Sequence, residues 1–131
     1  MMDLQQAEDL FKQAIEAYKN NDLELAIQLW SQIEKSPDEV KEIYGKAQVN
    51  LGFLLNELKR FAEAEHAYKN VSREDSKKLY VTTQVNLGIL LKQQQRFEEA
   101  EQAFKNVTRE DSVEQYAKAQ FNLGILLKQQ Q

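Results

Sequence analysis

The chain contains no cysteine, only one proline and only four glycines among its 131 residues. Without cysteine it can form neither a disulfide bond nor a thiolate metal site. The shortage of proline and glycine favours helices, because alanine, leucine, glutamate, lysine and glutamine are plentiful and are strong helix formers. The longest apolar runs, such as LGFLL, fall far short of the roughly 20 residues that span a membrane.

An excess of positive charge is also absent, since 17 basic residues stand against 21 acidic ones and the formal net charge is −4. Nucleic-acid-binding proteins usually present a basic face or stripe, so no nucleic-acid partner is expected. The opening residues, MMDLQQAEDLFKQ, lack the charged segment and apolar stretch of a secretory signal peptide. We therefore expect a soluble cytoplasmic protein that does not bind membranes.

The sequence repeats itself with a period of 36 residues. The ten residues NLGILLKQQQ stand at 86–95 and again at 122–131, and KNVSREDS at 69–76 returns as KNVTREDS at 105–112. A more distant copy lies near the N-terminus, offset by 38 residues. Self-similarity at a period of about 20–50 residues is typical of solenoids and other repeat arrays.

Each repeat predicts two helices. Apolar residues three and four positions apart run from Ala47 to Leu58, and a second stripe of this kind runs from Phe61 to Val71. The two residues between the stripes are enough for the turn of an antiparallel helix pair. The predicted helices run over approximately 3–20, 22–34, 37–58, 61–71, 76–94, 97–107 and 112–130. The corresponding repeat units are approximately 3–35, 36–74, 75–110 and a half unit at 111–131.

Several helix starts are also visible. Ser36 fits the N-cap of a capping box, with proline in the first turn and Glu39 as the reciprocal partner. Ser112 stands at the same spacing from Gln115, and Ser76 occupies the corresponding place without a closing acid. We expect all three serines to cap helices.

A finer pattern within the repeats resembles the tetratricopeptide repeat, which reads W-x2-L-G-x2-Y, then A-x3-F, then P. Leu87 and Gly88 match the L-G pair, Ala100 follows the glycine by twelve residues, and Phe104 follows that alanine by four. The preceding repeat has Leu51, Gly52, Ala64 and Tyr68 at the same places. The first repeat is degenerate, with Ala14 in place of the glycine but Ala26 and Trp30 retained.

The chain departs from the family pattern at the tryptophan and proline positions. The replacements are Gln48, Gln84 and Gln120 for tryptophan, and Ser76 and Ser112 for proline. Each full unit also has about two extra residues between one helix pair and the next, compared with the family pattern. We interpret the extra residues as an earlier start of the first helix of each pair.

The resemblance implies an all-α fold, a right-handed α-solenoid of antiparallel helix pairs with three pairs and one unpaired C-terminal helix in a single array. Gly52 and Gly88 lack side chains where the paired helix must approach, and Ala64 and Ala100 are expected opposite them. The aromatic residues Trp30, Tyr68 and Phe104 are expected to fill the gap between one pair and the next. Neighbouring pairs would then share a continuous core.

No motif of catalysis or cofactor binding is present, since HExxH, GxSxG and glycine-rich phosphate loops are all missing. The single histidine, His66, falls on the polar side of a predicted helix, where a solvated side chain is expected. The acidic REDS segments at 73–76 and 109–112 lie at helix junctions, where acids favour the start of the following helix. We expect no enzyme activity, no cofactor and no metal.

The first helices of the pairs carry the candidate binding surface, because such helices line the concave side of a right-handed stack. An apolar stripe, a ladder of asparagines and flanking lysines face away from the predicted core there. An asparagine amide both donates and accepts hydrogen bonds, so this surface suits an extended or helical peptide. The candidate residues are Phe11, Ile15, Tyr18, Lys46, Val49, Asn50, Phe53, Asn56, Val85, Asn86, Ile89, Lys92, Phe121, Asn122, Ile125 and Lys128.

A structural interpretation of the same residues stays open. The apolar side chains would then pack against the adjacent first helix, and the asparagines would bridge neighbouring helices. Some tetratricopeptide repeats grip a C-terminal carboxylate with polar side chains, but valine, phenylalanine and isoleucine occupy most of those places here. The predicted function is a non-catalytic scaffold that binds a peptide or partner protein whose identity the sequence does not specify.

The last helix supports an alternative function. It keeps Leu123, Leu126 and Leu127 in the same letters as the internal copy, whereas a capping helix should have a polar outer face. Two explanations fit this helix: it is the cap of the array, or the sequence is a fragment of a longer array cut at a repeat boundary. The unchanged leucines favour the fragment. We expect these leucines to be exposed and to drive contact with a second copy, giving a homodimer or larger homo-oligomer, or else the helix at 112–131 to fray.

Overall fold

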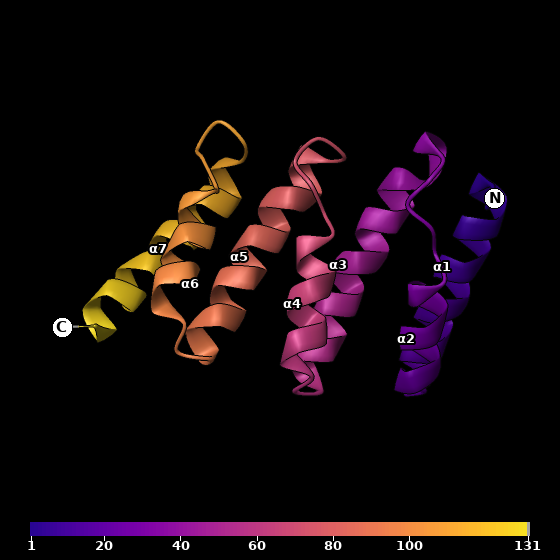
Figure 1. Ribbon diagram of the computed structural model, residues 1–131, viewed down its shortest axis with the longest axis horizontal. Coiled ribbons are helices and arrows are strands. Elements are labelled where there is room, and N and C mark those ends of the chain that lie inside the picture. Colours follow the sequence, from indigo (N-terminus) through magenta and orange to yellow (C-terminus); the bar gives the residue numbers. More distant parts are fainter. Residues whose placement is uncertain (131) are drawn as a thin grey trace. The chain divides into compact units, whose positions relative to one another are not determined.

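The computed structural model describes residues 1–130, and this part of the chain is all-helical, with no strand (Figure 1). The predicted all-α fold class, with helices in antiparallel pairs as in an α-solenoid, is confirmed. None of the described helices is long and apolar enough to cross a membrane. The helices are α1 (Leu4–Lys19), α2 (Leu23–Ser31), α3 (Lys41–Glu57), α4 (Phe61–Lys69), α5 (Lys77–Gln93), α6 (Phe97–Lys105) and α7 (Val113–Gln129), with a 3-10 turn η1 at Asp38–Val40.

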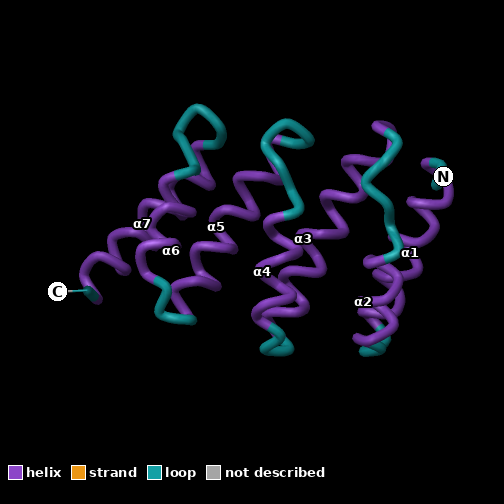
Figure 2. Tube along the Cα trace, viewed as in Figure 1, coloured by secondary structure: helices purple, strands orange, loops and turns teal. Residues whose placement is uncertain are grey.

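The chain divides into two compact units, one comprising Met1–Val71 and the other beginning at Ser72. In the first unit α1 pairs with α2 and α3 pairs with α4, and α2 also contacts α3. In the second unit α5 pairs with α6, and α7 packs against both of them. Short turns join the helices of each pair (Figure 2). All seven predicted helices are present, with ends that differ by a few residues, whereas a single array over the whole chain stays a prediction.

The first helix of each pair ends in the same kind of turn. Asn21, Lys59 and Gln95 have left-handed backbone conformations, with φ of 62°, 63° and 61°. The next residue then donates a backbone hydrogen bond to the helix five residues back, as from Arg60 N to the Leu55 carbonyl at 2.8 Å. This is a Schellman motif, which satisfies the last carbonyls of the helix and reverses the chain direction.

Each full pair is closed by an aromatic ring that lies on a glycine. A Cβ atom added to Gly52 would lie 2.7 Å from Cζ of Tyr68, and one added to Gly88 would lie 2.7 Å from Cζ of Phe104. Both rings are buried, and burial raises the pKa of Tyr68 to about 12. The ring occupies the space that a side chain on the first helix would need, so only glycine allows this contact.

Ala64 and Ala100 were expected to lie opposite the two glycines, but the aromatic rings lie there instead. The atoms nearest to each glycine belong to the ring and not to Ala64 or Ala100, which are themselves fully buried. The reason is reach, since a ring extends across the pair where an alanine methyl group cannot. Tyr68 and Phe104 therefore pack within their own pair, where the sequence had predicted that they would fill the gap between pairs.

A buried amide pair locks the same helices together. Gln48 Oε1 accepts a hydrogen bond from Asn70 Nδ2 at 2.9 Å, and Gln84 Oε1 accepts one from Asn106 Nδ2 at 2.8 Å. Both glutamines are 6% exposed and stand at the family's tryptophan position. Each bond joins the middle of a first helix to the C-cap of its second helix. Buried polar groups need such partners, and an asparagine provides one for each glutamine.

Two of the three predicted serine caps are confirmed. Ser76 Oγ accepts a hydrogen bond from the backbone of Leu79, and Ser112 Oγ accepts one from Gln115, each at 3.2 Å. The predicted capping box at Ser36 is wrong. The 3-10 turn η1 intervenes there, and α3 begins only at Lys41, without a side-chain cap. The turn places Val40, which is fully buried, immediately before the helix.

Helix α7 uses one side to pack and leaves the other open. Leu126 is fully buried and Leu123 is 8% exposed, so the expectation that these leucines lie in water is wrong. The reason is that both lie on the side of α7 that packs against α5 and α6. Leu127 is 43% exposed, and no atom lies within 4 Å of a Cβ added to Gly124. Gln131 lies outside the described residues.

Replacing glycine by alanine should have opposite effects on stability at Gly88 and Gly124, although the ten-residue stretches that contain them are identical. Gly88→Ala should lower the free energy of unfolding by about 1–3 kcal/mol, because the new methyl group overlaps the Phe104 ring. Gly124→Ala should raise it by about 0.5–1 kcal/mol, because alanine is the better helix former and the site is open. Urea denaturation followed by circular dichroism measures both, and equal effects would contradict the ring–glycine contact.

Candidate functional site

A shallow groove of about 450 Å³ lies between α1 and α3 in the first unit. Apolar side chains from both helices line it together with charged ones of either sign. The lining residues are Leu4, Glu8, Phe11, Lys12, Glu39, Glu42, Ile43 and Lys46. Two of them, Phe11 and Lys46, belong to the surface predicted from the sequence. The groove can therefore bury apolar groups of a ligand while its charged rim pairs with theirs.

The remaining predicted residues of the first unit continue along the same two helices. Asn50 follows Lys46 by four residues and Phe53 follows by seven, so all three share one face of α3. Phe53 is 49% exposed, and Ile15, Val49, Asn50 and Asn56 are half-buried. We call the surface formed by the groove and these residues the first-helix face.

The two aromatic residues of α1 have a structural contact as well. The ring of Phe11 lies 6.5 Å from that of Trp30, and the ring of Tyr18 lies 6.3 Å from it, measured between centroids. Trp30 is buried, so these rings complete the core of the first pair. Tyr18 is nevertheless 42% exposed and Phe11 lines the groove, which leaves both within reach of a ligand.

In the second unit the predicted residues lie on α5 and α7. Val85 is buried, at 4% exposure, because α6 and α7 both cover its helix, so it is a packing residue and not a surface contact. Its counterpart on α7, Phe121, is 70% exposed. Lys128 is exposed. The other predicted residues of this unit are half-buried: Asn86, Ile89, Lys92, Asn122 and Ile125.

The asparagine ladder is partly engaged within the protein. Asn122 Nδ2 donates a hydrogen bond to the Lys118 carbonyl of its own helix at 2.8 Å. This bond stays within α7, so the interpretation of Asn122 as a bridge between helices is not what its contact shows. Asn56, which is not part of the ladder of Asn50, Asn86 and Asn122, has a buried Oδ1 atom without a hydrogen-bond partner among the described residues.

The sequence model of the tetratricopeptide repeat family matches residues 85–131, which include the second half of α5 and all of α6 and α7. These residues belong to the tetratricopeptide repeat family. The 36-residue internal repeat extends the same pattern back over α3 and α4. A comparison with curated proteins found no match. Tetratricopeptide repeats generally mediate protein–protein interactions and are typically a non-catalytic fold.

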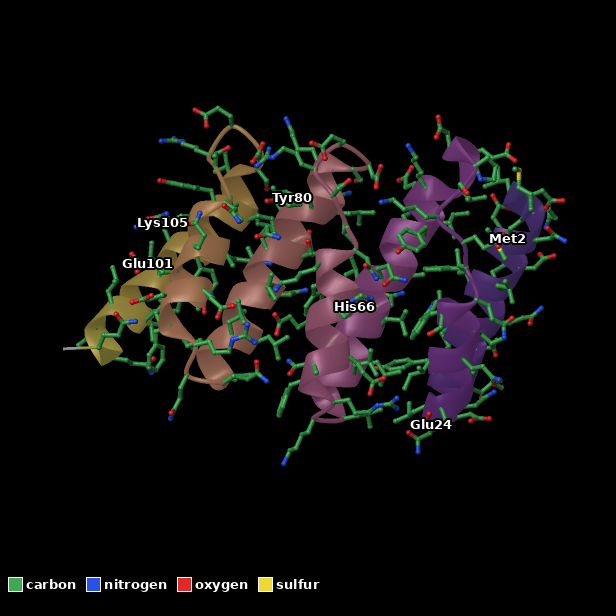
Figure 3. The ribbon with its side chains drawn as sticks, viewed as in Figure 1. Met2, Glu24, His66, Tyr80, Glu101 and Lys105 are labelled. Atoms are coloured by element: carbon green, nitrogen blue, oxygen red, sulfur yellow. The ribbon has the colours of Figure 1, made fainter. Side chains whose placement is uncertain are left out.

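His66 is exposed on α4 (Figure 3), where it borders an open groove of about 500 Å³ between α2, α3 and α4. The Glu101 and Lys105 side chains on α6 form an ion pair at 2.8 Å (Figure 3). Among residues 1–130 no group of three or more histidine or acidic side chains could hold a metal ion.

The REDS segment at 73–76 contacts the REDS segment at 109–112 through Arg73 and Asp111. The Arg73 guanidinium donates a hydrogen bond to Asp111 Oδ1 at 2.7 Å and another to the Asn106 carbonyl at 3.1 Å. It also lies over the Tyr80 ring, 4.9 Å from its centroid. The sequence suggested that these acids act on the following helix, but Asp111 instead serves as the partner of an arginine 38 residues away.

The ion pair has an electrostatic consequence. The hydrogen bond from Arg73 lowers the pKa of Asp111 from 3.8 to about 2, and hydrogen bonds from Thr108 contribute to the shift. A carboxylate whose pKa is lower in the folded state stabilises the fold above its ordinary pKa, and this stabilisation is lost as the pH falls toward the folded value. The contribution of this pair should therefore disappear as the pH falls from about 4 to about 2.

Replacement of the arginine tests this ion pair. In Arg73→Gln the pKa of Asp111 should move from about 2 back toward 3.8, because the main donor to its carboxylate is removed. The free energy of unfolding of the variant should also fall less steeply than that of the wild type between pH 4 and pH 2. Carboxyl-carbon NMR titration measures the pKa. Arg109→Gln, the corresponding exposed arginine of the next loop, is the control and should leave Asp111 unchanged. An unchanged pKa of Asp111 in Arg73→Gln would disprove the ion pair.

Proposed function

We propose that the chain is a non-catalytic cytoplasmic scaffold that binds a peptide or a segment of a partner protein on the first-helix face. The observation that carries the proposal is the groove between α1 and α3, with Phe53 exposed about two turns beyond Lys46 on α3. The general role of tetratricopeptide repeats in protein–protein interaction supports it.

The chemistry of the face indicates what kind of segment would bind. Exposed aromatic side chains are enriched among the anchors of protein interfaces, and burying one contributes about 1.5–3 kcal/mol. Phe53 and the groove residue Phe11 are such anchors. Lysines and glutamates both line the groove, so charge alone does not select the ligand. We expect a segment with two or more apolar side chains flanked by charges of both signs.

Fewer exposed residues support self-association, which is the other candidate function. Of the three leucines that would drive it, only Leu127 is exposed, while Leu123 and Leu126 belong to the core of the second unit. A single exposed leucine buries too little surface for a stable dimer, since specific interfaces bury about 800 Å² per partner. Binding of a different protein is therefore the function that we favour.

Affinity capture with mass spectrometry tests the first-helix face. The variant Phe53→Glu should lose at least one partner that the wild type captures, because a carboxylate replaces the exposed apolar anchor that a bound segment would bury. Leu25→Glu is the matched control, since Leu25 is an exposed apolar residue of α2, 40% accessible, and not part of this face. If Phe53→Glu folds as judged by circular dichroism and retains every partner, the first-helix face is not the binding surface.

A further inference from the structure

The first unit contains a second groove, which lies between the second helices of its two pairs. Helices α2 and α4 do not contact one another, and residues of both line this groove together with residues of α3. It has a volume of about 500 Å³ and shares no residue with the groove between α1 and α3. We call it the second-helix groove.

The floor of the second-helix groove is apolar. Leu51 and Leu55 of α3 and Ile27 of α2 all line it, and all three are buried. The carboxylate on its rim, Glu63, accepts hydrogen bonds from the Arg60 guanidinium at 3.0 and 2.8 Å, so its charge is already balanced. The groove therefore suits an uncharged apolar side chain, which leaves water when it lies on this floor.

The amide pair of Gln48 and Asn70 also lines this groove. Gln48 Oε1 accepts from Asn70 Nδ2, but among residues 1–130 Gln48 Nε2 donates no hydrogen bond and Asn70 Oδ1 accepts none. The fully buried side-chain atoms without a partner in this part of the chain are Trp30 Nε1 and Asn56 Oδ1. The two free atoms of the amide pair are therefore accessible, and the groove is the space that both residues border.

These two atoms provide one donor and one acceptor from neighbouring side chains. In an extended peptide the N–H and C=O of one residue point to the same side, as in a hydrogen-bonded pair of an antiparallel sheet. Gln48 Nε2 can donate to such a C=O while Asn70 Oδ1 accepts from the N–H. Because Gln48 is only 6% exposed, this donor is largely shielded from water, and a ligand that pairs with it satisfies a polar group that the protein leaves free.

We propose that the second-helix groove binds an extended segment of a partner protein through one uncharged apolar residue. The backbone C=O of that residue accepts from Gln48 Nε2, its N–H donates to Asn70 Oδ1, and its side chain lies on Leu51 and Leu55. The groove uses no residue of the first-helix face, so this site is additional to the one in the proposed function.

The smallest piece of such a segment tests the proposal. The probe is N-acetyl-leucine N-methylamide, titrated into the ¹⁵N-labelled full chain and followed by two-dimensional NMR. The side-chain amide signals of Gln48 and Asn70 should shift saturably, with a dissociation constant on the order of 1 mM for a ligand of this size. The glycine analogue, which lacks the side chain, should bind about tenfold more weakly or worse. The ester analogue, in which oxygen replaces the leucine N–H, should bind about fivefold more weakly.

Variants of the chain locate the site. Ala62→Trp on α4 and Ser31→Trp on α2 should each abolish saturable binding, because a large ring then occupies the groove. Both positions are exposed, so the fold should stay intact, which circular dichroism checks. Glu98→Trp, at the exposed position one repeat after Ala62, is the matched control and should bind the probe normally. Phe53→Glu should also bind it normally, which separates this site from the first-helix face.

Four results would overturn the proposal. The first is the absence of saturable shifts at probe concentrations on the order of 10 mM. The second is an ester analogue that binds as tightly as the amide, because the amide pair would then play no part. The third is binding that both tryptophan variants leave unchanged. The fourth is a set of shifts that Phe53→Glu abolishes, because the probe would then bind the first-helix face.

Discussion

The contact between an aromatic ring and a glycine is the constraint on which the rest of each helix pair depends. Phe104 on Gly88 and Tyr68 on Gly52 hold the two helices at a separation that no larger residue would permit. The hydrogen bonds between the glutamine and asparagine side chains join the same two helices of each pair, at 2.9 and 2.8 Å, within the usual range for such bonds. The tight turn between the helices needs one residue with a left-handed backbone conformation. Asn21, Lys59 and Gln95 adopt it here, and none of them is a glycine.

The first-helix face is the surface that we propose for recognition. It carries the groove between α1 and α3, and Phe53 lies exposed on the same face of α3.

The period and the helical stripes were sufficient to predict all seven helices, and Ser76 and Ser112 were correctly identified as caps. Periodicity does not reveal which partner a stripe faces, so Leu123 and Leu126 were wrongly expected in water. Ser36 does not cap α3 because the 3-10 turn η1 lies between them and the helix begins only at Lys41. The groove and the amide pairs depend on residues far apart in sequence, so no local pattern could predict them, although glutamine at the tryptophan position was a visible signal.

Hydrogen exchange of the backbone amides tests the ring–glycine contact most directly, because the two identical stretches have the same intrinsic exchange rates. The amides of residues 87–90 in α5, under the Phe104 ring, should exchange more slowly than those of residues 123–126 in α7, where no ring is present. In a Phe104→Ala variant the protection of α5 should fall toward that of α7. Equal protection of the two stretches in the wild type, or α5 protection that survives loss of the ring, would contradict the central role of this contact.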